Sequence, residues 1–266
     1  MDLDHRSTVA ARRALVPLVS GSLLLAAPAI ARAHERDFTL SRDWHLPYKG
    51  ENEIEARSFW QTKHNDFVQQ FEYEYGVTDH FAIEPGVEFK KPNGEEFEIE
   101  AAEVELRMNF LEFDYDKLLP AMNLEYERRI KSGEDDDADA EEESDNKLEL
   151  KTILSLYTRD GQDFTVNSNV GRGFGGEGEH FWEGEITAGY SRQLDFIPGL
   201  AVSKEQPIEV GVEFIQEIFH EHRTGLGPLV TWRASQHFHV LATYVFALRE
   251  RSEESDELRF ILEWEI

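Results

Sequence analysis

The sequence contains no cysteine among its 266 residues. This absence excludes disulfide bonds, thiolate zinc sites and a thiol nucleophile. Basic residues are also scarce, since 27 Lys and Arg stand against 54 Asp and Glu, for a formal net charge of −27. Such a chain lacks the basic surface that binds phosphates, so nucleic acid is excluded as a partner. Beyond the N-terminal region, no segment approaches the roughly 18 apolar residues of a transmembrane helix.

The N-terminus carries the pattern of an export signal. The basic pair Arg12-Arg13 precedes an apolar stretch at 14–29, and the small-x-small sequence Ala31-Arg-Ala33 follows it. This order of features is typical of a secretory signal peptide. The predicted organisation is therefore a signal peptide at 1–33, a periplasmic N-terminal segment at 34–51 and a folded domain at 52–266.

From residue 52 onward, apolar residues recur at every second position. In the final stretch, one face carries Leu258, Phe260, Leu262, Trp264 and Ile266, and the other face carries Arg259, Glu263 and Glu265. A period of two predicts β-strands with one apolar and one polar face. We identify twelve such segments, each close to the ~9–11 residues that cross a bilayer at a tilt.

The predicted connections alternate between short and long. The short ones fall at 76–79, 159–162 and 235–237, and the long polar ones at 132–146, 173–180, 219–224 and 250–256. Bacterial barrels have short periplasmic turns and longer outer loops. The pattern predicts an all-β fold, an antiparallel transmembrane β-barrel of about 12 strands, with 10–14 compatible with the weak signal of each strand.

Three details depart from a regular pattern. A change of phase at Ala101-Ala102 predicts a β-bulge. Pro85 and Pro228 fall within predicted strands, where a closed barrel would need a bulge to accept them. The connections at 111–121 and 194–207 are long for the periplasmic side.

Taken together, the signal peptide, the Tyr75-Gly-Val-Thr-Asp79 turn before an alternating strand, and the aromatic final strand resemble the broad superfamily of small Gram-negative outer-membrane β-barrel proteins. The resemblance covers residues 52–266. It implies a location in the cell outer membrane, with outer-membrane lipid, lipopolysaccharide and the barrel assembly machinery as partners. It implies no specific function. The last residue, Ile266, departs from the aromatic residue that usually ends such chains, while Trp264 lies two residues before it.

The polar face of the predicted strands is rich in carboxylates, which need water or a partner when they are buried. This face predicts a passive channel or transport-associated protein with an acidic, cation-preferring lumen. A structural or binding barrel, plugged by Glu–Arg pairs, is the alternative. A soluble periplasmic lipocalin-like barrel, with its apolar faces inward, is a second alternative. The predicted lumen-facing acidic residues are Glu72, Glu74, Glu98, Glu100, Glu103, Glu105, Glu125, Glu183, Glu185, Glu213 and Glu263, and the basic ones are Arg107, Arg129, Arg192, Arg233 and Arg259.

Other features indicate little chemistry. The stretch 134–145 has nine acids in twelve residues, which predicts a solvated outer loop, with binding of divalent cations as a hypothesis. His220 and His222 have the i, i+2 spacing of metal ligands but are too few for a closed zinc site. Ser252 and Ser255 lie in another predicted outer loop. They could serve a lipid hydrolase only if these histidines lay beside them. The sequence also has no Gly-x-Ser-x-Gly motif. We therefore predict no enzyme activity, no metal centre and no cofactor.

Overall fold

The computed structural model describes residues 37–63, 65–92, 96–130, 145–175, 182–194, 207–219, 223–248 and 256–266, all within the unit formed by residues 32–266. The strands are β1 (Asn52–Gln61), β2 (Asp66–Thr78), β3 (Phe81–Lys91), β4 (Glu98–Asn109), β5 (Leu118–Arg129), β6 (Asn146–Tyr157), β7 (Gln162–Phe174), β8 (Trp182–Gln193), β9 (Ile208–Glu217), β10 (Thr224–Ser235), β11 (Phe238–Ala247) and β12 (Glu257–Glu265). Within these ranges, no helix is apolar and long enough to cross a membrane.

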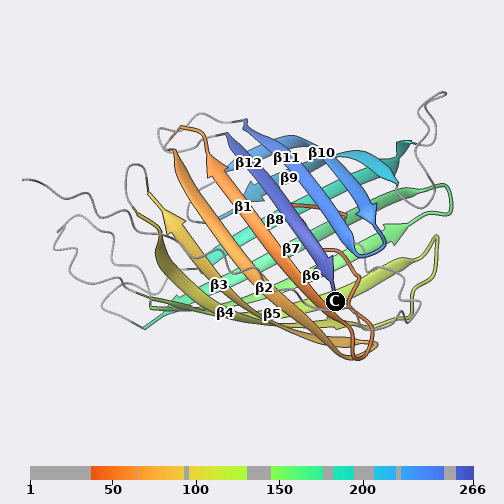
Figure 1. The fold of residues 1–266 in the computed structure, drawn as a ribbon, viewed down its shortest axis with the longest axis horizontal. Helices are drawn as coiled ribbons and strands as arrows, with labels where there is room; N and C mark the ends of the chain where they lie inside the picture. The colour runs from red at the N-terminus through yellow and green to blue at the C-terminus, as the bar shows by residue number, and fades with distance from the viewer. Residues whose placement is uncertain are drawn as a thin grey trace, which may run out of the picture. The chain divides into compact units, whose positions relative to one another are not determined.

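The strands form one closed antiparallel barrel (Figure 1). Each strand pairs with its neighbours in sequence, and β1 closes the barrel by pairing with β12, with Ile54 opposite Trp264. Closure gives every strand a partner on both sides, so no edge with unpaired backbone groups faces lipid. The predicted antiparallel barrel of about 12 strands is confirmed.

The alternation of the sequence becomes an apolar outer wall and a polar inner wall. In β12, Phe260 and Trp264 are 38% and 60% exposed on the outside, whereas Glu257 and Glu263 are buried on the inside. The same arrangement recurs around the barrel, as it must when successive side chains point to opposite faces. A lipocalin would carry its apolar residues inside, so the soluble alternative is wrong and the wall fits an outer-membrane barrel.

The two ends of the barrel differ in their connections. One end, called here the turn end, carries the connections at 79–80, 158–161 and 236–237, and the opposite end is called the loop end. Aromatic residues lie on the outer face near both ends, as in the girdles that meet lipid headgroups. They are Trp60 and Trp182 near the loop end and Tyr190, Trp232 and Trp264 near the turn end.

The predicted irregularities are only partly present. The strand pairing shifts where Glu88 faces Ala101 and Phe89 faces Ile99, so the bulge lies at Glu100, slightly before the predicted position. Pro85 and Pro228 occupy strands without the expected bulges. Instead, the hydrogen-bond ladder on one side of each proline is interrupted and resumes in the same register. No carbonyl of the neighbouring strand therefore depends on the N–H that proline lacks.

Candidate functional site in the barrel lumen

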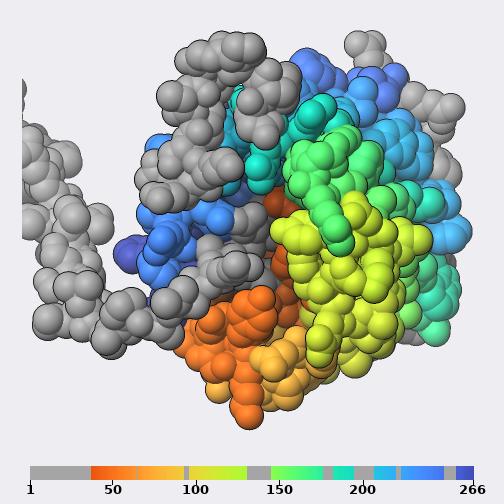
Figure 2. Space-filling model, turned by 90° about the vertical axis from the view of Figure 1, so that its right-hand side faces the viewer, coloured from red at the N-terminus to blue at the C-terminus, as the bar shows by residue number. Residues whose placement is uncertain are grey.

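Residues Asp37–Leu46 lie inside the barrel, and we call them the luminal segment. Phe38 and Ser41 are fully buried, and Arg42 and Asp43 are 4% and 2% exposed. Figure 2 shows part of this segment, in red-orange, at the centre of one end of the barrel. The prediction that residues 34–51 form a periplasmic segment is therefore wrong for 37–46, because these residues find their partners on the inner wall.

Hydrogen bonds join the luminal segment to strands on one side of the barrel. The Leu40 N–H and the Thr39 hydroxyl both donate to the Glu213 carboxylate of β9, over 2.7 and 2.6 Å. The Ser41 hydroxyl donates to Thr187 of β8 over 3.0 Å. Backbone groups that leave water must find such partners, and here inner-wall side chains supply them.

A tight apolar contact fixes the same part of the segment. The ring of Phe38 packs against Gly189 of β8, where an added Cβ would lie only 2.3 Å from a ring carbon. The glycine thus leaves the space that the ring fills. Further along, Trp44 packs into a small apolar cluster with Leu119, Ala121, Ile153 and Tyr157.

On the opposite wall, Arg42 enters a cluster of acidic and basic side chains. Its guanidinium lies 2.9 Å from Glu72 and 3.5 Å from Glu55, and it also contacts Glu84. Arg57 of β1 pairs with the same carboxylates. All of these side chains are buried or nearly so, and a charge in such surroundings needs an oppositely charged partner. We call Arg42, Arg57, Glu55, Glu72 and Glu84 the Arg42 cluster.

Arg107 of β4 extends this network along the wall. Its guanidinium pairs with Glu74 and donates a 2.9 Å hydrogen bond to the His45 carbonyl. The His45 ring forms a hydrogen bond with the Tyr157 hydroxyl, in which Nδ1 and the oxygen are 3.0 Å apart. The luminal segment is therefore bound to inner-wall groups from Thr39 to His45.

Towards the loop end the inner wall carries a second charged group. Lys147 of β6 lies 2.7 Å from Glu183 and 3.2 Å from Glu149. Beside them, Glu103, Glu125 and Glu127 bring their carboxylate oxygens within 4.8 Å of one another. Carboxylates this close repel each other unless water or cations screen them.

Most of the residues predicted to line the lumen lie on the inner wall. Glu100 lies at the bulge, and Glu98 is exposed at the strand end, opposite Lys90. Arg192 differs: it pairs with Gln162 and Val210, on the outward face that it shares with Tyr190, so its predicted lumen position is wrong. The inner-wall residues of the predicted set are Glu72, Glu74, Glu103, Glu105, Glu125, Glu183, Glu185, Glu213, Glu263, Arg107, Arg129, Arg233 and Arg259.

The sequence-based set missed Arg42, Glu84 and Asp163. Glu84 and Asp163 were detectable, because each stands on the polar face of an alternating strand. Arg42 was not, because residues 37–46 have no strand period and no repeated spacing. The positions 134–144, His220, His222, Ser252 and Ser255 lie outside the described residues.

At the turn end, the luminal segment brings its own carboxylates to those of the wall. The carboxylates of Asp37, Asp163 and Glu209 have oxygens within 4.8 Å of one another. Asp43 lies beside them and accepts a 3.1 Å hydrogen bond from the Asp37 N–H. Burial, together with the charges of Asp163 and Glu209, raises the pKa of the Asp37 carboxyl well above its usual range.

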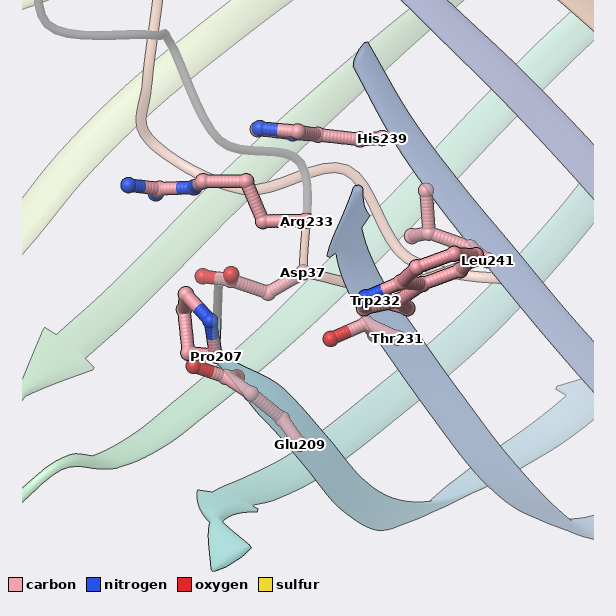
Figure 3. Close-up of a pocket in the computed structure, with 8 residues that line it drawn as sticks. All are labelled: Asp37, Pro207, Glu209, Thr231, Trp232, Arg233, His239 and Leu241. Atoms are coloured by element: carbon pink, nitrogen blue, oxygen red, sulfur yellow. The ribbon is translucent and has the colours of Figure 1, made fainter. Parts of the chain in front are cut away.

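A small cavity adjoins this group (Figure 3). Its volume is about 20 Å³, which is room for about one water molecule. In the close-up, the carboxylates of Asp37 and Glu209 lie near Pro207, and the side chains of Arg233 and His239 extend above them. The cavity lies where the luminal segment meets β9, β10 and β11, and its lining mixes the charged side chains with the apolar Pro207 and Leu241.

Comparison with solved structures identifies the fold. The KdgM porin in complex with disordered oligogalacturonate matches with a TM-score of 0.55 at 8% identity, covering 80% of this chain and 98% of that one. The NanC porin gives 0.54 at 6% identity, covering 80% and 100%. An outer-membrane channel from Pseudomonas putida F1 gives 0.52 at 10% identity, covering 84% and 98%.

At these identities the likeness establishes the architecture alone. No family model matches the chain, and no curated protein is similar to it in sequence. The chain therefore has the fold of small outer-membrane β-barrels of the porin kind, as the resemblance in its sequence implied.

Proposed function

We propose that this protein is a passive outer-membrane channel with a cation-preferring lumen, narrowed at its turn end by the luminal segment. The turn end faces the periplasm in this proposal. The observation that carries it is the inner wall near the loop end, where Glu103, Glu125 and Glu127 approach one another within 4.8 Å. Clustered carboxylates need water around them, and rings of Asp and Glu favour cations over anions in a pore.

The similar structures support the transport part of this proposal, since two of them are porins and a third is an outer-membrane channel. The preference for cations comes from this chain alone. A second candidate function is a closed structural barrel, and the buried luminal segment with its Arg42 cluster favours it. The two functions differ in a single property, namely whether the inserted barrel passes ions.

The test is single-channel recording of the purified full-length protein in planar bilayers under a KCl gradient. If the proposal is correct, the recordings show discrete openings, and the reversal potential has the sign that a cation-selective channel gives. Replacing Glu103, Glu125 and Glu127 by Gln, singly and then together, should lower that preference stepwise. Glu112→Gln, a change at an exposed position in the connection between β4 and β5, is the control and should leave it unaltered.

Two outcomes contradict the proposal. Anion preference, or a preference that survives the triple replacement, would mean that these carboxylates do not set selectivity. Silence from protein whose insertion is verified by protease protection would favour the closed structural barrel.

A further inference from the structure

The carboxylates at the turn end form a compact group with too little positive charge. Asp37 is 5% exposed, Asp163 9% and Glu209 3%, and their oxygens lie within 4.8 Å of one another. Asp43, 2% exposed, adds a fourth carboxylate through its contact with Asp37. Isolated ionised carboxylates are strongly disfavoured in such surroundings, so the group requires protons or a cation.

Asp163 supplies the observation that points to a ligand. Within the described ranges, no hydrogen bond or ion pair engages its carboxylate, although the residue is only 9% exposed. The groups that act on it electrostatically are acidic, namely Glu209 and Asp43. The carboxylate is thus directed into the group formed with Asp37 and Glu209 rather than towards a protein donor.

The basic groups nearby have other acidic neighbours. Arg233, on β10, borders the cavity beside Asp37 and Glu209, and the acidic groups that act on its charge are Glu263 and Glu265 of β12. The ring of His239, on β11, has Nδ1 3.6 Å from a Glu263 oxygen. On the luminal segment, the His45 ring lies 3.7 Å from Asp43. Neither Arg233 nor these histidines supplies an ion pair to Asp163.

We propose that Asp37, Asp163 and Glu209 bind one divalent cation of the oxygen-preferring class, Ca²⁺ by preference, with Asp43 as a further oxygen donor. Oxygens that share a Ca²⁺ ion at about 2.3–2.6 Å lie within about 5 Å of each other, and the spacing here meets that limit. Carboxylates are the ligands such cations prefer, and the adjoining cavity of about 20 Å³ leaves room for a water ligand. The site joins the luminal segment to β7 and β9, and it does not depend on whether the barrel conducts.

The test measures Ca²⁺ binding to the full-length, detergent-folded protein by calorimetry after EDTA treatment, with Mg²⁺ and Tb³⁺ as further probes. The proposal expects one saturable site above the weak binding of other acidic groups. Asp163→Asn and Glu209→Gln should each weaken that site at least tenfold. Glu112→Gln, which removes an exposed carboxylate from the connection between β4 and β5, is the control and should retain it.

Thermal unfolding separates ligation from a merely structural role. In EDTA, Asp163→Asn should melt at a higher temperature than the unaltered protein, because one of the repelling charges is gone. In millimolar Ca²⁺ the order should reverse, because only the unaltered protein gains from binding. Equal Ca²⁺ affinity in Asp163→Asn and the unaltered protein, or no saturable site at all, would overturn the proposal. Should Asp163→Asn not fold, Glu209→Gln carries the same comparison.

Discussion

Replacing Arg42 by Gln should release the luminal segment from the barrel wall. Arg42 is 4% exposed and faces Glu55, Glu72 and Glu84. Removing one partner of a buried ion pair costs about 3–5 kcal/mol, because the remaining charges lose their compensation. Undocking relieves that cost, since the wall carboxylates then meet water. The change shifts the balance between docked and undocked segment by roughly 100-fold or more.

The assay is single-channel conductance in planar bilayers, which reports directly on how much of the lumen is filled. We expect Arg42→Gln to raise the mean conductance or the open fraction. Arg57→Gln is the matched control, since Arg57 contacts the same carboxylates but belongs to the wall strand β1. It removes the same charge and leaves Arg42 as the main partner of these glutamates, so the segment should stay docked.

The comparison between the two variants decides the question. An equal rise in both would mean that lumen charge, and not the luminal segment, controls conduction. No rise in Arg42→Gln, with folding intact, would mean that the remaining contacts of Phe38, Trp44 and the Glu213 hydrogen bonds hold the segment alone.

Two further predictions test the position of the segment and the direction of the wall. Because the protein has no cysteine and the Ser41 and Thr187 hydroxyls are 3.0 Å apart, Ser41→Cys with Thr187→Cys should form a disulfide that locks the segment in place. In the Arg42→Gln background, oxidation should return the conductance to its original value, and reduction should raise it again. Ser41→Cys alone is the control and should not respond to oxidation or reduction. If forming the disulfide does not change the conductance, the segment lies outside the ion path. Val212, 39% exposed on the outer face, should tolerate Leu but lose about 2–4 kcal/mol of folding free energy on replacement by Arg if it lies near the bilayer midplane. Urea unfolding in lipid vesicles measures this loss, and an unaltered midpoint in Val212→Arg would contradict the outward assignment.

The architecture could be predicted from sequence because it depends on a local pattern. Alternation as in Leu258, Phe260 and Trp264 determines which face of a strand meets lipid, and the register follows once neighbouring strands pair along the chain. The prediction failed for Arg192 because the alternation was not followed there. Arg192 lies two residues after Tyr190, on the same outward face. The prolines were misjudged for another reason, since a ladder can skip the proline and resume in register without a bulge.

The tertiary structure alone decided what fills the lumen. Residues 37–46 have no period, and their partners lie far along the chain, as with Thr39 and Glu213, 174 positions apart. The pairing of β1, β2 and β3 along the chain places Glu55, Glu72 and Glu84 close together. Only the path of the luminal segment through the closed barrel brings Arg42 to them and places Asp37 beside Asp163 and Glu209. The sequence by itself determined the wall and its two faces, because alternation is local. Which carboxylates meet across the lumen depends on how the closed sheet surrounds the segment, and no local pattern encodes that.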